Sequence, residues 1–112
     1  MTLPKDMEIL KAAAAAAGLR ISNWRLAGGA YVTSATRRAP FRWDPENDSG
    51  QALELAALLR MPIWYEESAV VADQRKCGDL GWRVEFGLHD GHRDRATRQA
   101  ILKAAAKRKA MA

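Results

Sequence analysis

Apolar residues recur at intervals of three and four over three stretches of the chain, and each stretch predicts a helix. The first covers residues 3–17 and ends at Gly18, which favours a helix end because glycine readily adopts left-handed backbone angles. The second lies between Asp48 and Met61, and the third covers residues 94–109. The inner face expected for the third helix consists of Thr97, Ala100, Ile101, Ala104 and Ala105.

Between the second and third helices the apolar spacing becomes alternating, which predicts strands. In the last of these strands Trp82, Val84 and Phe86 share one face, so it is expected to be half-buried in an antiparallel sheet. A polar connection over residues 74–79 predicts that the last two strands form a hairpin. The expected strands are residues 63–65, 69–72 and 80–88.

Two further strands are expected before the second helix, at residues 21–26 and 30–33, with Trp24 and Tyr31 as core aromatics. The glycine pair at 28–29 is interpreted either as a turn or as a loop that approaches a ligand, because glycine permits close backbone contact. The sequence leaves both interpretations open.

These elements predict a single α+β domain over residues 1–112. A small, mainly antiparallel sheet of three to four strands would pack with about three helices. The length of 112 residues agrees with one domain, because a chain of this size leaves no room for a second hydrophobic core. The hydrophobic content of 48% argues against disorder.

The segment around residues 43–59 combines several signals for the start of one helix. Trp43 is expected to anchor the segment, and Pro45 keeps the backbone before it extended or turned. Asp48 is the expected N-cap, with its carboxylate accepting a free backbone N–H. Gln51, three residues later, fits the reciprocal half of a capping box.

The helix that follows is expected to be central and mostly buried. Leu53 and Leu58 flank its apolar face and widen that face on both sides, a pattern that predicts burial over most of the circumference. Met61 and Pro62 are expected to end the helix.

Positive charge is concentrated near the end of the sequence. The formal net charge is +5, and residues 91–112 alone hold seven Lys or Arg against one Asp. This distribution suits contact with nucleic acid or another anionic surface, or a solvated helix face that keeps a small protein in solution. The cations at residues 107–109 also lie at the negative end of the helix dipole, which is a local reason for their presence.

Six basic residues form the candidate contact surface. Three arginines surround residues 39–41 and stand close to two aromatic side chains, and arginines near exposed aromatics can hold a phosphate backbone while bases stack. Three further basic residues lie on the outer face or the border of the last helix. The candidate contacts are Arg37, Arg38, Arg42, Arg95, Lys103 and Lys107.

The leading hypothesis from these features is a non-enzymatic module that binds an unknown protein. The alternative is sequence-independent nucleic-acid binding through the basic last helix and the arginines near residue 40. Formation of a homo-oligomer is also compatible with the Ala-rich helices, because short side chains permit close helix contacts.

Side chains able to bind a metal gather between residues 77 and 94, yet their pattern does not fit a metal site. A structural zinc site needs four ligands, usually Cys or His in closely spaced pairs, and the sequence holds one Cys. The acids near the last helix are interpreted as caps, with Asp94 or Asp90 at its start. No metal and no cofactor are expected. The side chains between residues 77 and 94 that could bind a metal are Cys77, Asp79, His89, Asp90, His92 and Asp94.

No catalytic arrangement is predicted either. A cysteine enzyme needs a base held by a third group, and the sequence assigns no such base to Cys77. Glu66 and Glu67 are expected to point to opposite faces of a strand and not to converge. The glycine pair at 28–29 lacks a phosphate-binding pattern. The protein is therefore predicted not to be an enzyme.

The sequence predicts a cytoplasmic protein without membrane contact. It has no apolar run long enough to span a bilayer, and its first residues include acids and do not resemble a signal peptide. A single cysteine suits a reducing compartment.

Two separated pieces of the chain resemble a recurring pattern in small uncharacterised proteins of phages and prophages. Residues 43–61 read WDPENDSGQALELAALLRM, and residues 96–106 read ATRQAILKAAA. The family they resemble is the phage alpha/beta/alpha sandwich domain of unknown function, although Gln51 stands where an acid is common. The resemblance implies a helix–sheet–helix layered fold and a phage or prophage origin, hence a bacterial host cell, and it implies no catalytic residues. With it, the leading hypothesis becomes an accessory protein that binds a host or phage protein.

Overall fold

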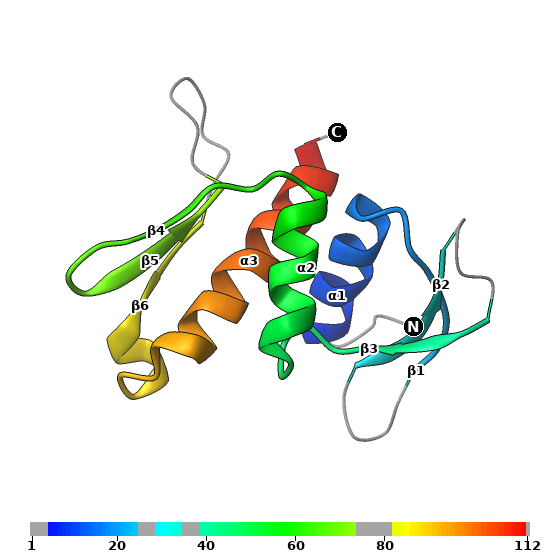
Figure 1. Cartoon of the computed structure of the whole chain (residues 1–112), viewed down its shortest axis with the longest axis horizontal. Helices are drawn as coiled ribbons and strands as arrows, with labels where there is room; N and C mark the ends of the chain where they lie inside the picture. Colours follow the sequence, from blue (N-terminus) through cyan, green and yellow to red (C-terminus); the bar gives the residue numbers. More distant parts are fainter. Residues whose placement is uncertain (1–4, 25–28, 35–38, 74–81, 112) are drawn as a thin grey trace.

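The computed structural model describes residues 5–24, 29–34, 39–73 and 82–111. Within these residues the chain forms three α-helices, six short strands and one 3-10 helix (Figure 1). The helices are α1 (Lys5–Ala16), α2 (Ser49–Leu58), η1 (Phe86–His89, the 3-10 helix) and α3 (Arg93–Met111). The strands are β1 (Arg20–Trp24), β2 (Ala30–Thr33), β3 (Phe41–Trp43), β4 (Ile63–Tyr65), β5 (Ala69–Ala72) and β6 (Trp82–Glu85).

The strands form two antiparallel sheets that lie on opposite sides of the helices (Figure 1). One sheet has the order β1-β2-β3 and contacts α1, and the other has the order β4-β5-β6 and packs against α3. The predicted α+β class, with antiparallel strands and about three helices, is confirmed. The expected single sheet is replaced in the described chain by two sheets of three strands, with the helices as the middle layer.

The position of α2 in the sequence explains the two sheets. Three strands precede α2 and three follow it, and short connections favour pairing between strands that are neighbours in the chain. Each group therefore closes its own sheet, and α2 and α3 separate the two groups.

The centre of the molecule is α3, which packs against α1, α2, β5 and β6. The inner face predicted from the sequence is confirmed, and burial extends beyond it on both sides. Alanine makes this possible, because its short side chain lets several elements approach one helix closely. The buried residues of α3 are Ala96, Thr97, Ala100, Ile101, Leu102, Ala104 and Ala105.

The helix predicted to be central, α2, covers one side of α3 instead. Ala52, Leu55 and Ala56 are buried, whereas Leu53 and Leu58 are 57% and 61% exposed. The prediction of a mostly buried helix was therefore wrong. Residues that widen an apolar face become buried only where a second element covers them, and the main contact of α2 in the described chain is with α3.

Two of the helices end through a residue with left-handed backbone angles. Gly18 has a φ of +75° after α1, and the N–H of Leu19 donates to the carbonyl of Ala14 at 2.8 Å, as expected for a glycine C-cap. Arg60 ends α2 in the same way with a φ of +51°. The end of α2 therefore lies just before the Met-Pro pair predicted from the sequence.

The start of α2 matches the sequence prediction in part. The Asp48 carboxylate accepts a hydrogen bond from the N–H of Gln51 at 3.1 Å, which confirms the N-cap. The side chain of Gln51 does not complete a capping box. Its Oε1 accepts from the N–H of Asp44 at 2.5 Å and its Nε2 donates to the carbonyl of Arg42 at 2.6 Å, so Gln51 joins α2 to the end of β3.

Trp43 and Pro45 are buried, as expected for residues that anchor this segment. Gly29 lies directly against the same segment. It has a φ of +76°, and a Cβ at this position would lie 2.7 Å from the Cβ of Asp44. Close backbone contact at Gly29 is therefore made with the protein's own chain, while Gly28 lies outside the described residues.

The strands β1 and β2 pair as predicted, but one expected core aromatic is not in the core. Ala30 and Val32 point inward and are fully buried, so Tyr31, between them, points outward and is exposed. Trp24 is half-buried and packs against the core.

The predicted hairpin of β5 and β6 is confirmed. The last strand is shorter than expected, because β6 ends at Glu85 and the chain continues as η1. Val84 and Phe86 are buried as their shared face predicts, whereas Trp82 remains partly exposed.

The start of α3 differs from the prediction. The helix begins at Arg93, and the carbonyl of His92 accepts from the N–H of Ala96 at 3.1 Å. Asp94 lies inside the first turn, and Asp90 has left-handed angles at the end of η1. Neither acid occupies the residue before the helix, so the expected cap is wrong, although Asp94 still stabilises the positive end of the helix dipole.

Candidate functional site

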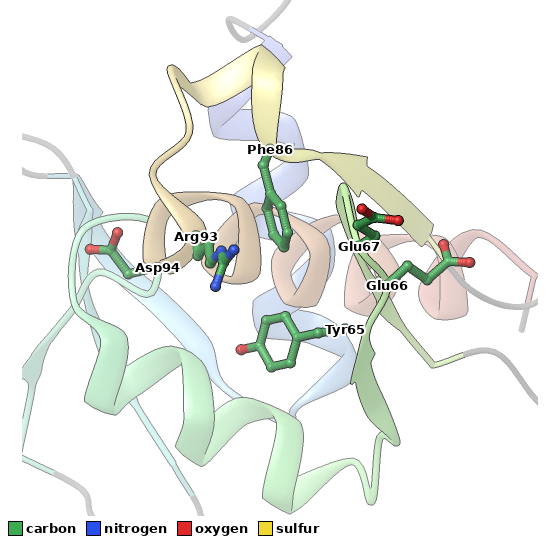
Figure 2. A pocket seen from close by; sticks show the side chains of 6 residues that line it. All are labelled: Tyr65, Glu66, Glu67, Phe86, Arg93 and Asp94. Atoms are coloured by element: carbon green, nitrogen blue, oxygen red, sulfur yellow. The ribbon is translucent and has the colours of Figure 1, made fainter.

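A cavity of about 480 Å³ lies between the tip of the β4–β5 hairpin, η1 and the first turn of α3 (Figure 2). We call it the cleft. Its volume is within the range of sites that hold a small molecule or a few peptide side chains. Its lining residues are Tyr65, Glu66, Glu67, Phe86, Arg93 and Asp94.

Two aromatic rings form the apolar walls of the cleft. Their centroids are 6.4 Å apart and their planes are inclined by 30°. Phe86 is buried and its N–H donates to the carbonyl of Ser68 at 2.9 Å, which connects η1 to the hairpin tip. Tyr65 is 59% exposed, so most of this apolar side chain is open to contact from outside.

A chain of hydrogen bonds holds Tyr65 in place. The hydroxyl of Thr97 donates to the carbonyl of Arg93 at 2.7 Å. Because a threonine hydroxyl has one proton, the contact of 3.0 Å between the hydroxyls of Tyr65 and Thr97 has Tyr65 as its donor. The ring therefore has a fixed orientation before any partner arrives.

Two of the four charged residues of the cleft already have ionic partners. Glu66 accepts from Arg83 Nε at 2.8 Å and Glu85 accepts from Arg83 Nη1, and these bonds, with that to Glu66 first, raise the pKa of Arg83. Asp94 accepts from Arg98 at 3.1 Å, and this bond together with the backbone N–H of Arg95 lowers the pKa of Asp94. Both carboxylates are therefore occupied as acceptors.

The other two charged residues, Glu67 and Arg93, form no ion pair with the described residues. Glu67 lies in the hairpin turn rather than within a strand, so strand alternation does not govern its direction. It shares no partner with Glu66, which is bound by Arg83. The guanidinium of Arg93 lies 5.4 Å from the ring centroid of Phe86, a cation–π contact. The cleft thus presents one unpaired negative and one unpaired positive charge.

The two histidines lie near the cleft but do not line it. His89 is half-buried, and burial, followed by repulsion from Arg95 and Lys103, lowers its pKa. His92 is exposed. No group of three or more potential metal ligands occurs among the described residues, and the predicted Cys77 and Asp79 lie outside them.

The basic residues predicted as partner contacts do not form one surface in the described chain. Arg42 is exposed on β3, whereas Lys103 lies 5.6 Å from the ring of Trp82 on β6, and Figure 1 places these strands at opposite ends of the molecule. Arg95 is exposed and Lys107 is half-buried. Arg37 and Arg38 lie outside the described residues.

Two arginines of the basic last helix have structural contacts that sequence reasoning missed. Arg98 donates from Nε to the carbonyl of Glu46 at 2.8 Å and from Nη1 to the hydroxyl of Ser49 at 2.8 Å, so it joins α3 to the start of α2. The only nearby residue in the sequence that indicated a contact of Arg98 was Asp94, one helical turn earlier. Gln99 makes a longer contact of 3.5 Å with the Glu46 carboxylate.

Arg108 makes the second structural contact. It binds both carboxylate oxygens of Asp73 at 2.5 Å and donates to the carbonyl of Leu59 at 2.6 Å. Asp73 is fully buried, and its bond to Arg108 raises the pKa of the guanidinium. The two partners are 35 residues apart, and no motif in the sequence connects them.

Comparison with known proteins identifies no relative of the chain. No protein-family model matches the chain, and neither a curated protein nor a solved structure matches it. Among the described residues, none of the helices is both long and apolar enough to cross a membrane.

Proposed function

We propose that this protein is a non-enzymatic interaction module that binds a segment of another protein in the cleft. The observation that carries the proposal is the combination of an open cavity with an exposed, oriented aromatic ring at Tyr65 and charges at Glu67 and Arg93 that form no ion pair within the described part of the chain. Exposed aromatic and arginine side chains are the residue types that contribute most to protein interfaces.

The chemistry of the cleft favours binding over catalysis. A general acid at neutral pH needs a raised carboxyl pKa, whereas the pKa of Asp94 is lowered by Arg98. The Glu66 carboxylate is already bound by Arg83. The paired groups are therefore suited to holding the walls of the cleft in position.

The resemblance of residues 43–61 and 96–106 to small phage and prophage proteins supports a further part of the proposal, a role as an accessory protein in a bacterial host cell. The partner would then be a host or phage protein.

Site-specific photo-crosslinking tests the proposed function. A photoreactive amino acid is placed at Leu88, an exposed residue of η1 beside the cleft, and in a second protein at Tyr31, an exposed residue of the other sheet. In lysate of the producing cells, we expect a defined crosslinked partner from position 88 and none from position 31. The crosslink should disappear in Tyr65→Ala. Equal crosslinking from both positions, or persistence in Tyr65→Ala, would contradict binding in the cleft.

Nucleic-acid binding is the second candidate, and the contact of Lys103 with the partly exposed Trp82 favours it. A cation beside an aromatic ring can hold a phosphate while a base stacks. The internal contacts of Arg98 and Arg108 reduce the free positive charge of α3 and weaken this candidate. A gel-shift titration decides: binding at low salt that falls steeply with added salt supports it, and no binding at low salt ends it.

A further inference from the structure

We propose that the cleft recognises an extended peptide segment with one acidic and one basic side chain at positions i and i+2. This inference rests on the proposed function and adds the chemistry of the partner. It follows from the unpaired charges, the size of the cavity and the nature of its walls.

The unpaired charges lie on opposite sides of the aromatic pair. Figure 2 shows Arg93 on one side of the Tyr65 and Phe86 rings and Glu67 on the other. In a ligand with two basic groups, one of them would be repelled by Arg93. In a ligand with two acidic groups, one of them would be repelled by Glu67. A ligand with one charge of each sign can satisfy both residues.

The size of the cavity limits how much of a ligand can enter it. Its volume of about 480 Å³ has room for a few side chains. In an extended peptide, side chains two positions apart lie on the same face and are separated by roughly 6.6 Å. An i, i+2 pair therefore fits the cleft with both side chains directed inward, whereas adjacent residues point to opposite faces.

The aromatic walls suit the apolar parts of such side chains. The methylene groups of Lys, Arg or Glu pack on apolar surface while their charged ends remain hydrated or paired. The exposed ring of Tyr65 offers this surface, and the Arg93 guanidinium already lies over Phe86, so a guanidinium is compatible with this wall.

The test measures peptide binding by amide chemical shifts of the ¹⁵N-labelled full chain. The peptides are N-acetylated and C-amidated, so that only side chains carry charge, and have the cores Glu-Ser-Lys, Lys-Ser-Glu, Glu-Ser-Glu, Lys-Ser-Lys and Gln-Ser-Gln. We expect the better mixed-charge peptide to bind about tenfold more tightly than Gln-Ser-Gln, as two partly exposed ion pairs would give. The largest shifts should fall at residues 65–67, 86 and 93.

Charge reversal then predicts the preferred peptide. Glu67→Lys makes both unpaired charges positive and should prefer Glu-Ser-Glu, whereas Arg93→Glu should prefer Lys-Ser-Lys. The matched controls are Glu54→Lys and Arg95→Glu, which make the same charge changes at exposed positions outside the cleft. The controls should keep the wild-type order of peptides. Should a reversal fail to fold, Glu67→Gln and Arg93→Gln should each weaken mixed-charge binding by up to about fivefold.

Each outcome decides the proposal. A peptide order that is unchanged in the cleft variants, or changed equally in the controls, overturns it, as do shifts away from the cleft. If no peptide binds but the crosslink from position 88 persists, the segment chemistry is wrong and the proposed function stands. If no peptide binds and no crosslink forms from position 88, the peptide chemistry and the proposed function are both wrong.

Discussion

The two ends of α3 use the same residue types with different results. At the C-terminal end, Arg108 binds Asp73 through two bonds of 2.5 Å, and Asp73 is fully buried. At the N-terminal end, the side chain of Asp94 is 68% exposed where it meets Arg98, and Arg93 has no ionic partner in the described chain. The two ion pairs therefore differ in the burial of their carboxylates and not in residue type, because Arg108 meets a buried aspartate and Arg98 an exposed one.

Substitutions at the two ends of α3 should therefore change the free energy of unfolding by different amounts. Removing one partner of a buried ion pair leaves an uncompensated charge and costs about 3–5 kcal/mol. An exposed ion pair typically contributes about 0.2–1 kcal/mol, because water screens it. Variants of α3 can therefore separate stability from binding along one helix.

The largest expected effect is that of Arg108→Met. The free energy of unfolding should fall by about 3–5 kcal/mol, because the buried carboxylate of Asp73 loses the two hydrogen bonds that Arg108 donates to it. Urea unfolding followed by circular dichroism measures it. The exposed control Arg95→Met should change stability by less than about 0.5 kcal/mol.

A double variant sharpens this prediction. Asp73→Asn with Arg108→Met removes the buried negative charge and should be more stable than Arg108→Met alone. Asn also tolerates the left-handed angles at position 73, where φ is +63°. If the double variant is no more stable than the single one, packing rather than the buried charge accounts for the loss.

An intermediate effect is expected for Arg98→Met. Arg98 is only 12% exposed and serves the carbonyl of Glu46 and the hydroxyl of Ser49, so we expect a loss of about 1–3 kcal/mol. Thermal unfolding measures it. A loss as large as that of Arg108→Met would contradict the proposed gradient between the two ends.

Local features of the fold could be predicted from the sequence, and distant contacts could not. Gly18 and Asp48 act on the backbone within a few residues, so their roles follow from local chemistry. The exposure of Leu53 depends on which element covers α2, and the pairing of Asp73 with Arg108 joins residues far apart in the chain. Neither the exposure of Leu53 nor the pairing of Asp73 with Arg108 produces a periodic pattern in the sequence.

The cleft was missed for a related reason. Periodicity placed Tyr65 and Phe86 correctly at a strand and on a buried face, but the cavity needs the β4–β5 turn, η1 and α3 to meet in space. The charged residues of the turn were interpreted as strand residues. The sequence instead indicated basic residues as the contact surface. Of these, Arg42 lies on β3 and Lys103 contacts Trp82 on β6, and these two strands lie on opposite sides of the helices.

A small effect on stability is expected for two charged residues of the cleft, Arg93 and Glu67. Glu67→Gln should change the free energy of unfolding by less than about 0.5 kcal/mol, because its side chain is exposed and forms no ion pair with the described residues. Arg93→Gln should cost at most about 1 kcal/mol, because this exposed side chain loses only its cation–π contact with Phe86. Urea unfolding under the conditions used for Arg108→Met checks this. A loss above 2 kcal/mol, well beyond the roughly 0.5 kcal/mol typical of surface substitutions, would mean that these residues hold the fold.

The smallest effect concerns pH. Burial, followed by repulsion from Arg95 and Lys103, lowers the pKa of His89 below its usual 6.5. Because the unfolded chain then takes up the proton more readily, stability should decrease as the pH falls through 6.5 and level off below the folded pKa. Imidazole titration by NMR measures the midpoint. Arg95→Gln should raise it, and a midpoint at or above 6.5 in the wild type would contradict the assignment.

The most direct test of the different roles along α3 compares crosslinking from position 88 in Arg93→Glu and Arg95→Glu. The two variants carry the same charge change two residues apart on one helix, and Arg93 alone lines the cleft. We expect a severalfold loss of the crosslinked partner in Arg93→Glu and an unchanged yield in Arg95→Glu. Equal yields in the two variants would contradict a partner that binds in the cleft.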